Sequence, residues 1–384
     1  MIKNKQKKIR VLCFGRFYDE IPGGMQRHVE HLFAALAGKV EFVHLVPSRT
    51  REGAEFLVHG FPVIRTPSIN MDGSLAVSPQ LILKALQLHK KYQFDLIHLH
   101  FPDPMSHLAS MFLPSSIPRI ISWHADIIRQ RKLFRFYRPL LRHAIKKASA
   151  IVVATPSHIE SSLELMRITD KDRLHVIPYG FDLERFVSEN KSSDMIQGQY
   201  PGKIIFALGR HVYYKGFDIL INAMKDIHPD ARLLIGGVGP LTPKLKELVA
   251  RLGLEKRINF LGLIKEKDLP AYYQASDIFC LPAVSQAEAF GIVQVEAMAS
   301  GLPVVSTELH NGVSYVNRDG VSGLIVPPSD PDALADAINK LLDNDELRNK
   351  LAMQARERAL KEFSFESMGQ RMLKLYEDVV AART

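Results

Sequence analysis

Short apolar runs rich in β-branched residues recur along this 384-residue chain, with helical patterns between them. Such alternation is typical of a parallel sheet covered by helices on both faces. We therefore predict an α/β protein with two Rossmann-like, doubly wound domains. The predicted strands are Ile9–Gly15, Val40–Val46, Asp95–His100, Arg119–Trp123, Ala150–Thr155 and His175–Tyr179, and then Lys203–Leu208, Arg232–Gly236, Arg257–Leu261, Asp277–Leu281, Pro303–Ser306 and Gly323–Val326.

The break between the two series of strands predicts the domain boundaries. We assign residues 1–187 to the first domain and residues 203–362 to the second. Residues 188–202 are polar and rich in turn formers, which indicates a linker and hinge. Asp330 and Pro331 predict the start of a helix over Asp332–Leu342. A last amphipathic helix within residues 363–384 could pack on either domain.

The charge is unevenly distributed, although the composition is that of a globular protein. The net charge is +9, yet residues 1–190 carry 27 Lys and Arg against 17 Asp and Glu, so the second half is nearly neutral. Cys13 and Cys280 lie in apolar runs, and we expect both in the core. Two cysteines form neither a disulfide framework nor a metal-ligand spacing. No run approaches the roughly 20 apolar residues of a membrane span.

The positive charge is concentrated between Arg129 and Lys147, a segment with eight cations and no acidic residue. Aromatic and aliphatic residues interleave with the cations, a combination suited to an anionic membrane surface. We therefore expect a cytoplasmic protein that is peripheral on the inner face of the cytoplasmic membrane. A solvated helix face is one alternative. Nucleic acid is another, but no nucleic-acid motif accompanies the segment, so we expect no nucleic-acid partner.

The most informative segment is residues 285–307, with the sequence SQAEAFGIVQVEAMASGLPVVST. It predicts a loop that enters a helix near Phe290 or Gly291, and Gly301 ends that helix. Such a loop lies at the carboxyl edge of a parallel sheet, where helix N-termini attract phosphate. Glu288 and Glu296 could line one crevice, because a carboxylate accepts hydrogen bonds from vicinal sugar hydroxyls. Two unrelated surface glutamates are the alternative.

The full segment resembles the Glu-x7-Glu pattern of retaining glycosyltransferases of the GT-B fold, in particular glycosyltransferase family 4 (glycosyl transferases group 1). Other family elements occur in the expected order, namely PGGMQRHVEHL, LGRHVYYKGFDILINAM and IGGVGPLTPKLKEL. Two further segments, SWHADIIRQRKLFRFYRPL and SYVNRDGVSGLIVPP, resemble bacterial mannosyltransferases that build O-antigen and other surface polysaccharides. The resemblance also implies that the two domains face each other across a cleft and that the last helix returns to the first domain.

This resemblance implies catalytic roles for four side chains. Arg210 and Lys215 would clamp the diphosphate of a nucleotide sugar and stabilise the charge of the leaving group. Glu288 would contact the hydroxyls of the donor sugar, and His124 would lie near that sugar in the first domain. Glu296 would accept hydrogen bonds from the ribose hydroxyls.

The resemblance also implies donor-binding contacts that involve backbone or apolar groups. Amide groups at the predicted helix N-terminus would meet phosphate or sugar oxygens, and a glycine pair would bring backbone close to the donor. Two apolar residues are candidates, by position alone, for contact with the base. These residues are Phe290, Gly291, Ile292 and Val293 at the helix start, Gly23 and Gly24 in the glycine pair, and Leu263 and Ile264 near the base.

The predicted activity is retaining hexosyl transfer, with mannose from GDP-mannose, to a lipid-linked or oligosaccharide acceptor in surface polysaccharide or lipopolysaccharide synthesis. The resemblance favours same-face attack over double displacement. No Asp-x-Asp metal motif is evident, because Asp170 and Asp172 lie in a polar connection. We therefore expect metal-independent transfer with no cofactor beyond the nucleotide sugar. A UDP-sugar transferase, a sugar-nucleotide epimerase and a non-catalytic binding protein remain open.

Overall fold

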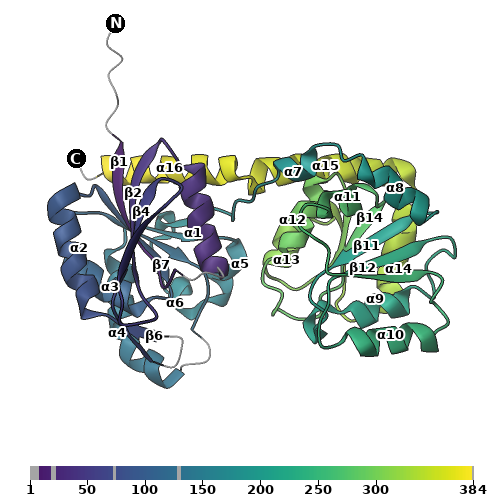
Figure 1. The fold of residues 1–384 in the computed structure, drawn as a ribbon, viewed down its shortest axis with the longest axis horizontal. Coiled ribbons are helices and arrows are strands. Elements are labelled where there is room, and N and C mark those ends of the chain that lie inside the picture. Colours follow the sequence, from purple (N-terminus) through teal and green to yellow (C-terminus); the bar gives the residue numbers. More distant parts are fainter. Residues whose placement is uncertain (1–7, 19–22, 72–74, 128–130, 383–384) are drawn as a thin grey trace, which may run out of the picture. The chain divides into compact units, whose positions relative to one another are not determined.

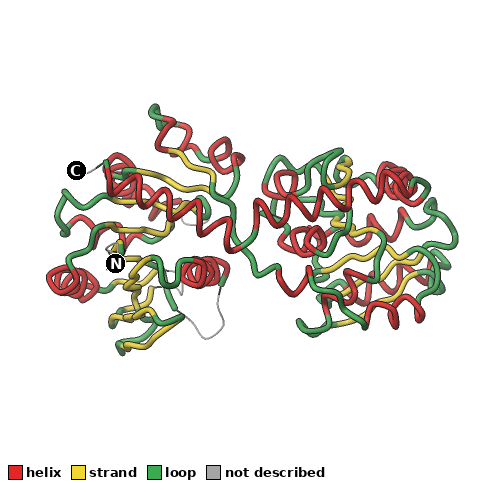
Figure 2. Tube along the Cα trace, turned by 90° about the horizontal axis from the view of Figure 1, so that it is seen from above, coloured by secondary structure: helices red, strands yellow, loops and turns green. Residues whose placement is uncertain are grey.

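The computed structural model describes residues 8–18, 23–71, 75–127 and 131–382, and the chain forms two compact units (Figure 1). Unit 1 comprises residues 1–181 and 365–384, and unit 2 comprises residues 182–364. Each unit is built on a largely parallel sheet with helices packed against it (Figure 2). The α/β class with two Rossmann-like domains is therefore confirmed.

The sheet of unit 1 has the strand order β10-β9-β8-β7-β1-β2-β4-β3, and only β3 is antiparallel to its neighbour. All six predicted strands of this half are present, and β3 to β6 occupy a region for which the sequence predicts none. The strands are β1 (Ile9–Phe14), β2 (Val40–Pro47), β3 (Ala54–Val58), β4 (Phe61–Thr66), β7 (Leu96–Phe101), β8 (Arg119–Trp123), β9 (Ala150–Val153) and β10 (Leu174–Val176), with β5 (Ile69–Met71) and β6 (Leu75–Val77) as a separate pair.

Alternate residues of β1 point into two hydrophobic cores, one on each face of the sheet. Leu12 and Phe14 pack on one face with residues of α2, α3 and α4, whereas Val11 and Cys13 pack on the other with residues of α1 and α16. The buried Cys13 agrees with the predicted core position. The helices of unit 1 are α1 (Gly24–Ala35), α2 (Pro79–Tyr92), α3 (Pro104–Met111), α4 (Arg131–Lys147), α5 (Pro156–Ser161), α6 (Leu163–Met166) and α16 (Phe365–Ala381), with the short η1 (Lys171–Arg173).

The sheet of unit 2 is entirely parallel, with the order β13-β12-β11-β14-β15-β16. The predicted helix after Asp330 is present, and the Asp330 carboxylate accepts a hydrogen bond from the amide of Ala333 at 2.9 Å. The strands are β11 (Ile204–Leu208), β12 (Arg232–Gly236), β13 (Ile258–Gly262), β14 (Ile278–Leu281), β15 (Val304–Thr307) and β16 (Gly323–Val326). The helices are α7 (Glu184–Val187), α8 (Ser192–Gln199), η2 (Tyr213–Lys215), α9 (Phe217–Ala223), α10 (Thr242–Arg251), α11 (Leu269–Gln274), α12 (Ile292–Ala299), α13 (Gly312–Val316), α14 (Pro331–Leu342) and α15 (Asp345–Phe363).

The predicted linker over residues 188–202 needs correction, because residues 182–202 belong to unit 2. They form α7 and α8, whose apolar side chains Phe186 and Ile196 are buried. The amide of Asn190, between the two helices, donates a hydrogen bond to Gln274 Oε1 at 2.8 Å. The chain then returns to unit 1 at residue 365, where α16 packs against α1. The predicted first domain therefore ends at residue 181 instead of 187.

Candidate functional site

The strand order of unit 2 reverses at β11, which lies between β12 and β14. The connections that leave β11 and β14 therefore meet at the carboxyl edge of the sheet, where α/β proteins form ligand sites. Lys215 lies on the first connection and Glu288 on the second. The Nζ atom of Lys215 is 2.6 Å from Oε2 of Glu288, and the two side chains are only 10% and 12% exposed. The structure thus joins two of the predicted catalytic residues as a nearly buried ion pair.

Backbone packing fixes the position of Lys215. Gly216, the next residue, has a φ of +64° and ends the short helix η2. A Cβ atom at Gly216 would overlap the carbonyl oxygen of Pro282, so this close approach of the two connections requires glycine. The amide of Val284 also donates a hydrogen bond to the carbonyl of Tyr214 at 2.9 Å. In contrast, Arg210 is exposed at the start of the connection.

The connection after β14 enters α12 through Gly291, which has a φ of +72°. The helix begins at Ile292, close to the predicted start, and Gly301 follows its end. Its first turn carries no acidic side chain, so the amide groups of Ile292 and Val293 lie at a helix end that favours an anion. Phe290 is buried edge-on against Phe363 and supports this turn.

Glu296 lies about one turn after the start of α12. Its hydrogen-bond partner could not be predicted from the sequence. The hydroxyl of Tyr273 donates a hydrogen bond to Glu296 Oε2 at 2.8 Å. Burial raises the pKa of Glu296 above its ordinary value, although the Tyr273 hydrogen bond acts in the opposite direction. Tyr273 is fully buried, and its apolar setting in the sequence gave no indication of this contact.

Leu263 and Ile264 follow β13 and border a cavity of about 600 Å³. Leu263 is 79% exposed, so it is not a core residue. The cavity is also lined by Tyr272 and by the cations Lys265 and Lys267. The two residues proposed for base contact therefore lie beside a partly apolar cavity of unit 2.

The remaining predicted residues lie in unit 1. Gly23 and Gly24 are exposed at the start of α1 and line a cavity of about 290 Å³. Two cations that the sequence analysis did not select, Arg16 and Arg49, line the same cavity. The guanidinium carbon of Arg49 lies 4.1 Å from the centre of the Phe17 ring, a cation–π contact.

His124 follows β8, as predicted, and is partly buried. Its Nε2 atom is 2.9 Å from Nδ1 of His100, and its Nδ1 atom is 3.2 Å from the hydroxyl of Tyr179. Burial lowers the pKa of His124 to about 3, so the imidazole is neutral at physiological pH. Both ring nitrogens are thus engaged within unit 1.

Two family profiles match this chain, each over one of the two units. The profile described as Glycosyltransferase Family 4 matches residues 22–185, and the profile described as Glycosyl transferases group 1 matches residues 195–358. D-rhamnosyltransferase WbpZ of Pseudomonas aeruginosa is 32% identical over 265 residues, which cover 69% of this chain and 68% of that protein. The chain belongs to glycosyltransferase family 4.

Two further comparisons agree with this family 4 assignment. O-antigen chain mannosyltransferase C of Escherichia coli is 28% identical over 304 residues, or 79% of this chain and 81% of that protein. The solved structure of Anabaena HepE in complex with UDP shares the fold, with a TM-score of 0.73 and 21% identity over 96% of this chain and 100% of that chain. The GT-B fold is therefore shown, and the chain is a glycosyltransferase by family.

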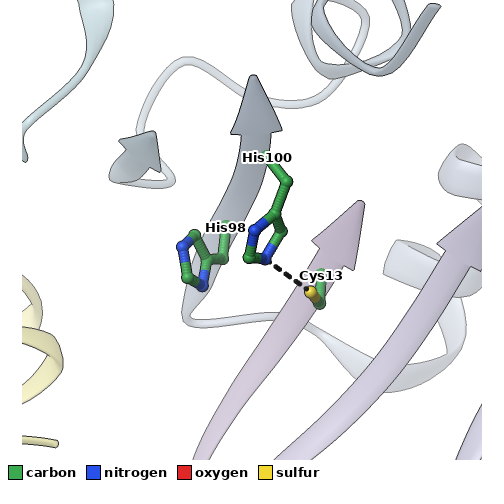
Figure 3. A group of neighbouring side chains, drawn as sticks. All are labelled: Cys13, His98 and His100. Carbon is green, nitrogen blue, oxygen red and sulfur yellow. Dashed lines mark hydrogen bonds between the residues drawn. The ribbon is translucent and has the colours of Figure 1, made fainter. Parts of the chain in front are cut away.

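Two groups of side chains in unit 1 of this glycosyltransferase have the composition of a metal site. They are Cys13 with His98 and His100, drawn in Figure 3, and His28 with His100 and His124. Both ring nitrogens of His98 and of His100 already have hydrogen-bonding neighbours. Burial also raises the pKa of the Cys13 thiol far above its usual range, which disfavours the thiolate that a metal requires. The group of Cys13, His98 and His100 is therefore a hydrogen-bonded array, whereas in the second group Nδ1 of His28 is buried without a hydrogen-bond partner. Asp170 directly precedes η1 and Asp172 lies within it, and both are exposed in this surface connection.

The basic segment of this glycosyltransferase forms the helix α4, although Arg129 lies outside the described residues. Arg138 and Arg142 are not free cations, since both form ion pairs with Glu164, at 2.6 and 3.2 Å. The Phe136 ring is 82% exposed beside other cations of the helix. Within the described parts of the chain, no helix is long and apolar enough to cross a membrane.

Proposed function

We propose that this protein is a retaining hexosyltransferase that transfers mannose from GDP-mannose to a lipid-linked or oligosaccharide acceptor in the synthesis of a bacterial surface polysaccharide or lipopolysaccharide. The nearly buried pair of Lys215 and Glu288 at the strand-order reversal of unit 2 carries the proposal. Shielding a charged pair from water carries a desolvation cost that apolar residues at the same place would not have, so a pair retained at an edge where ligand sites form favours a functional role. The name of the Escherichia coli relative supports mannose as the sugar.

The pair suits a site that must bind both a diphosphate and a sugar. A nucleotide sugar would replace the ion pair by two matched contacts, Lys215 with a phosphate oxygen and Glu288 with sugar hydroxyls. Arg210, which is exposed at the same edge, would supply a second cation, and the N-terminus of α12 would supply amide groups. Glu296 would accept hydrogen bonds from the ribose hydroxyls. In unit 1, His124 would contact the substrates.

The proposed chemistry is same-face displacement without a metal. The acceptor oxygen bonds to the anomeric carbon while the bond from that carbon to the phosphate oxygen breaks, and the departing phosphate takes the acceptor proton. Lys215, Arg210 and the helix N-terminus stabilise the charge that develops on the diphosphate. The protein then acts through positioning and electrostatics, and Glu288 needs no covalent step.

The donor is tested with a panel of GDP-, UDP- and ADP-sugars, by thermal shift and by nucleotide release, with and without EDTA. We expect a response to GDP-mannose that EDTA leaves unchanged. Release of UDP without any response to GDP-mannose would overturn the donor, and conversion of a sugar nucleotide to its epimer would overturn the reaction class. Lys215→Ala and Glu288→Gln should abolish transfer, whereas the exposed Lys225→Ala and Glu247→Gln should not.

The exposed face of α4 supports a peripheral membrane contact in this proposal. Arg135 and Phe136 are exposed neighbours in the sequence of α4, and Lys146 and Lys147 are exposed at the end of the same helix. None of these three cations takes part in the ion pairs with Glu164, which involve Arg138 and Arg142. Each cation near an anionic surface contributes on the order of 1 kcal/mol. We expect sedimentation with anionic vesicles that falls with salt and with Arg135→Glu, but not with Lys244→Glu in unit 2. Equal sedimentation with neutral vesicles would contradict this contact.

A further inference from the structure

Four polar side chains of unit 1 form a continuous chain that includes His124. The Sγ atom of Cys13 lies 3.5 Å from Nε2 of His100, and a dashed line marks this contact in Figure 3. Nδ1 of His100 is 2.9 Å from Nε2 of His124, and Nδ1 of His124 is 3.2 Å from the Tyr179 hydroxyl. Each imidazole thus uses one nitrogen toward each neighbour.

The topology of unit 1 creates this chain. The strand order reverses at β1, between β7 and β2, and β8 lies on the other side of β7. Cys13 lies on β1, His100 on β7 and His124 directly after β8, so neighbouring strands place the three side chains together. Tyr179 comes from the segment after β10. The chain therefore runs across the carboxyl edge of the sheet, where ligand sites form.

Packing leaves the two imidazoles little freedom to turn. His100 is fully buried, and its ring is within 8° of parallel to that of His124. His28 of α1 packs edge-on against His100, His124 and Tyr179, with ring centres 5.8, 5.0 and 5.1 Å away. Rotation of the His124 ring would therefore require His28 to move as well.

The chemistry of the four groups favours one direction for the hydrogen bonds. Burial lowers the pKa of His124 to about 3 and that of His100 well below its usual value, so both rings are neutral. A neutral imidazole has one donor and one acceptor nitrogen, and all bonds in the chain must therefore point the same way. A phenol is a stronger donor than a thiol. Protons thus point from Tyr179 toward Cys13, which leaves the His124 proton on Nε2.

We propose that His100 is a positioning residue that holds the His124 ring in one tautomer and orientation for the transfer reaction. His100 accepts the hydrogen bond of His124 Nε2–H and is itself anchored against Cys13. Nδ1 of His124 accepts the hydrogen bond of the Tyr179 hydroxyl. A substrate hydroxyl could donate to the same nitrogen if it displaced the Tyr179 hydroxyl. The catalytic part of this inference rests on the proposed function of His124.

His98 provides a matched control on the same strand. It lies two residues before His100, is equally buried, and bonds to the Tyr376 hydroxyl at 2.6 Å and to Ser122 Oγ at 2.8 Å. Neither of these bonds reaches His124. Loss of His98 therefore removes as much buried hydrogen bonding as loss of His100. It also removes a ring whose centre lies 4.4 Å from that of His100, but it removes no hydrogen bond from the chain of Cys13, His100, His124 and Tyr179.

The test compares His100→Leu, His100→Asn, His98→Leu and His98→Asn in the full-length protein. An asparagine oxygen can occupy the place of His100 Nδ1, so His100→Asn should retain the bond to His124 and rescue the leucine variant. We expect His100→Leu to lower kcat on the order of tenfold to a hundredfold with little change in donor KM. His98→Leu should lose stability without this selective loss of kcat. Equal kcat values for the two leucine variants would overturn the proposal.

A spectroscopic measurement tests the same inference without enzymatic activity. In protein with ¹⁵N-labelled histidine, the signals that disappear in His124→Gln identify His124. We expect the pattern of a neutral ring protonated on Nε2, preserved in His100→Asn and His98→Asn and changed in His100→Leu. A ring protonated on Nδ1, or a pattern that His100→Leu leaves unchanged, would refute the coupling.

The two measurements separate failure of this inference from failure of the proposed function. If the wild-type protein transfers no sugar while the ¹⁵N pattern depends on His100 as expected, the transfer function fails and the coupling of the rings stands. If transfer is present and the pattern is independent of His100, the proposed function stands and His100 has no positioning role. Tyr179→Phe extends the test with a milder change, because it removes one hydroxyl and should shift the Nδ1 signal of His124.

Discussion

Unit 1 should lose stability steeply between pH 7 and pH 5.5, because it buries several neutral histidines. A histidine in the unfolded chain titrates near pH 6.5. Burial lowers the pKa of these side chains when the unit is folded, so below pH 6.5 the unfolded state binds more protons and the folded state loses stability. The loss continues until the pH reaches the folded pKa values. These values are about 3 for His98, His107 and His124 and about 4 for His44.

The size of the effect follows from the linkage relation. At pH 5.5 each such histidine favours the unfolded state by about 1.4 kcal/mol, and the four together by about 6 kcal/mol. Asp103 acts in the opposite direction, because burial raises its pKa to about 6 and its protonation then favours the folded state. Over the same pH range protonation of Asp103 offsets only about 1 kcal/mol of this loss. The net loss of about 5 kcal/mol is a large part of the 5–15 kcal/mol that is usual for a domain.

The single tryptophan makes the measurement specific for unit 1. Trp123 lies in β8, is 2% exposed and donates a hydrogen bond to Asp126 at 2.8 Å. Urea unfolding followed by its fluorescence therefore reports unit 1 in the full-length protein. We expect the free energy of unfolding to fall by several kcal/mol from pH 7 to pH 5.5. A constant free energy over this range would refute the reasoning.

A single substitution tests the histidine origin of this slope. His107 donates to or accepts from the Tyr137 hydroxyl through Nδ1, at 2.6 Å, and an asparagine can offer a polar atom at the same place. His107→Asn should therefore reduce the slope below pH 6 by about 1.4 kcal/mol per pH unit. His143→Asn, at an exposed position of α4, should leave the slope unchanged. Equal slopes for His107→Asn and the wild-type protein would show that His107 does not contribute.

Three further substitutions test the packing of the two units. Lys215→Met leaves the Glu288 carboxylate nearly buried without its partner, so it should destabilise unit 2 by about 3 kcal/mol. Chemical unfolding followed by circular dichroism measures this loss. The double variant with Glu288→Gln should recover most of the stability but should not recover sugar transfer. Gly291→Ala should lower the free energy of unfolding by about 1–3 kcal/mol and weaken donor binding, because a Cβ at its φ of +72° also meets Leu281 and Gln294. Gly253 has a similar φ of +68° but open space around it, so Gly253→Ala measures the backbone cost alone. Similar losses of stability in the two variants would exclude a role for the contacts with Leu281 and Gln294. Tyr376→Phe removes a buried hydrogen bond to His98 and should destabilise unit 1 by about 1 kcal/mol, as Trp123 fluorescence measures, without a change in the thermal shift by nucleotide sugar.

The sequence predicted the strands and the core positions well, because each depends on local patterns. Apolar runs with β-branched residues marked every strand of the two sheets except β3 and β4, and the structure changes the bounds of the predicted strands by at most three residues. The short α7 and α8 were missed for the same reason. They bury Phe186 and Ile196, two isolated apolar residues in a polar segment, and only contact with the rest of unit 2 makes them helical. A local pattern cannot represent such tertiary stabilisation.

The family resemblance proposed Lys215 and Glu288 for one site, and the position of each after a parallel strand agrees with that, because parallel strands end at one edge of the sheet. Their pairing at 2.6 Å needs the additional fact that β11 and β14 are neighbours, which the order of strands along the chain does not state. The same limit explains why Tyr273 was missed. Its partner Glu296 lies 23 residues away and is reached from α11, whose packing against α12 no local pattern records.

The chain of Cys13, His100, His124 and Tyr179 in unit 1 could be predicted only in part from the sequence. The alternation in His98-x-His100 places both side chains on one face of a strand, which the sequence alone allows one to infer. Their partners do not follow from that spacing, because Cys13 is 87 residues from His100 and Tyr376 is 278 residues from His98. Only the strand order β8-β7-β1 and the return of α16 to unit 1 decide that one histidine bonds to His124 and the other to Tyr376. Two chemically identical residues on one strand therefore have different expected effects on catalysis, and that difference is a property of topology.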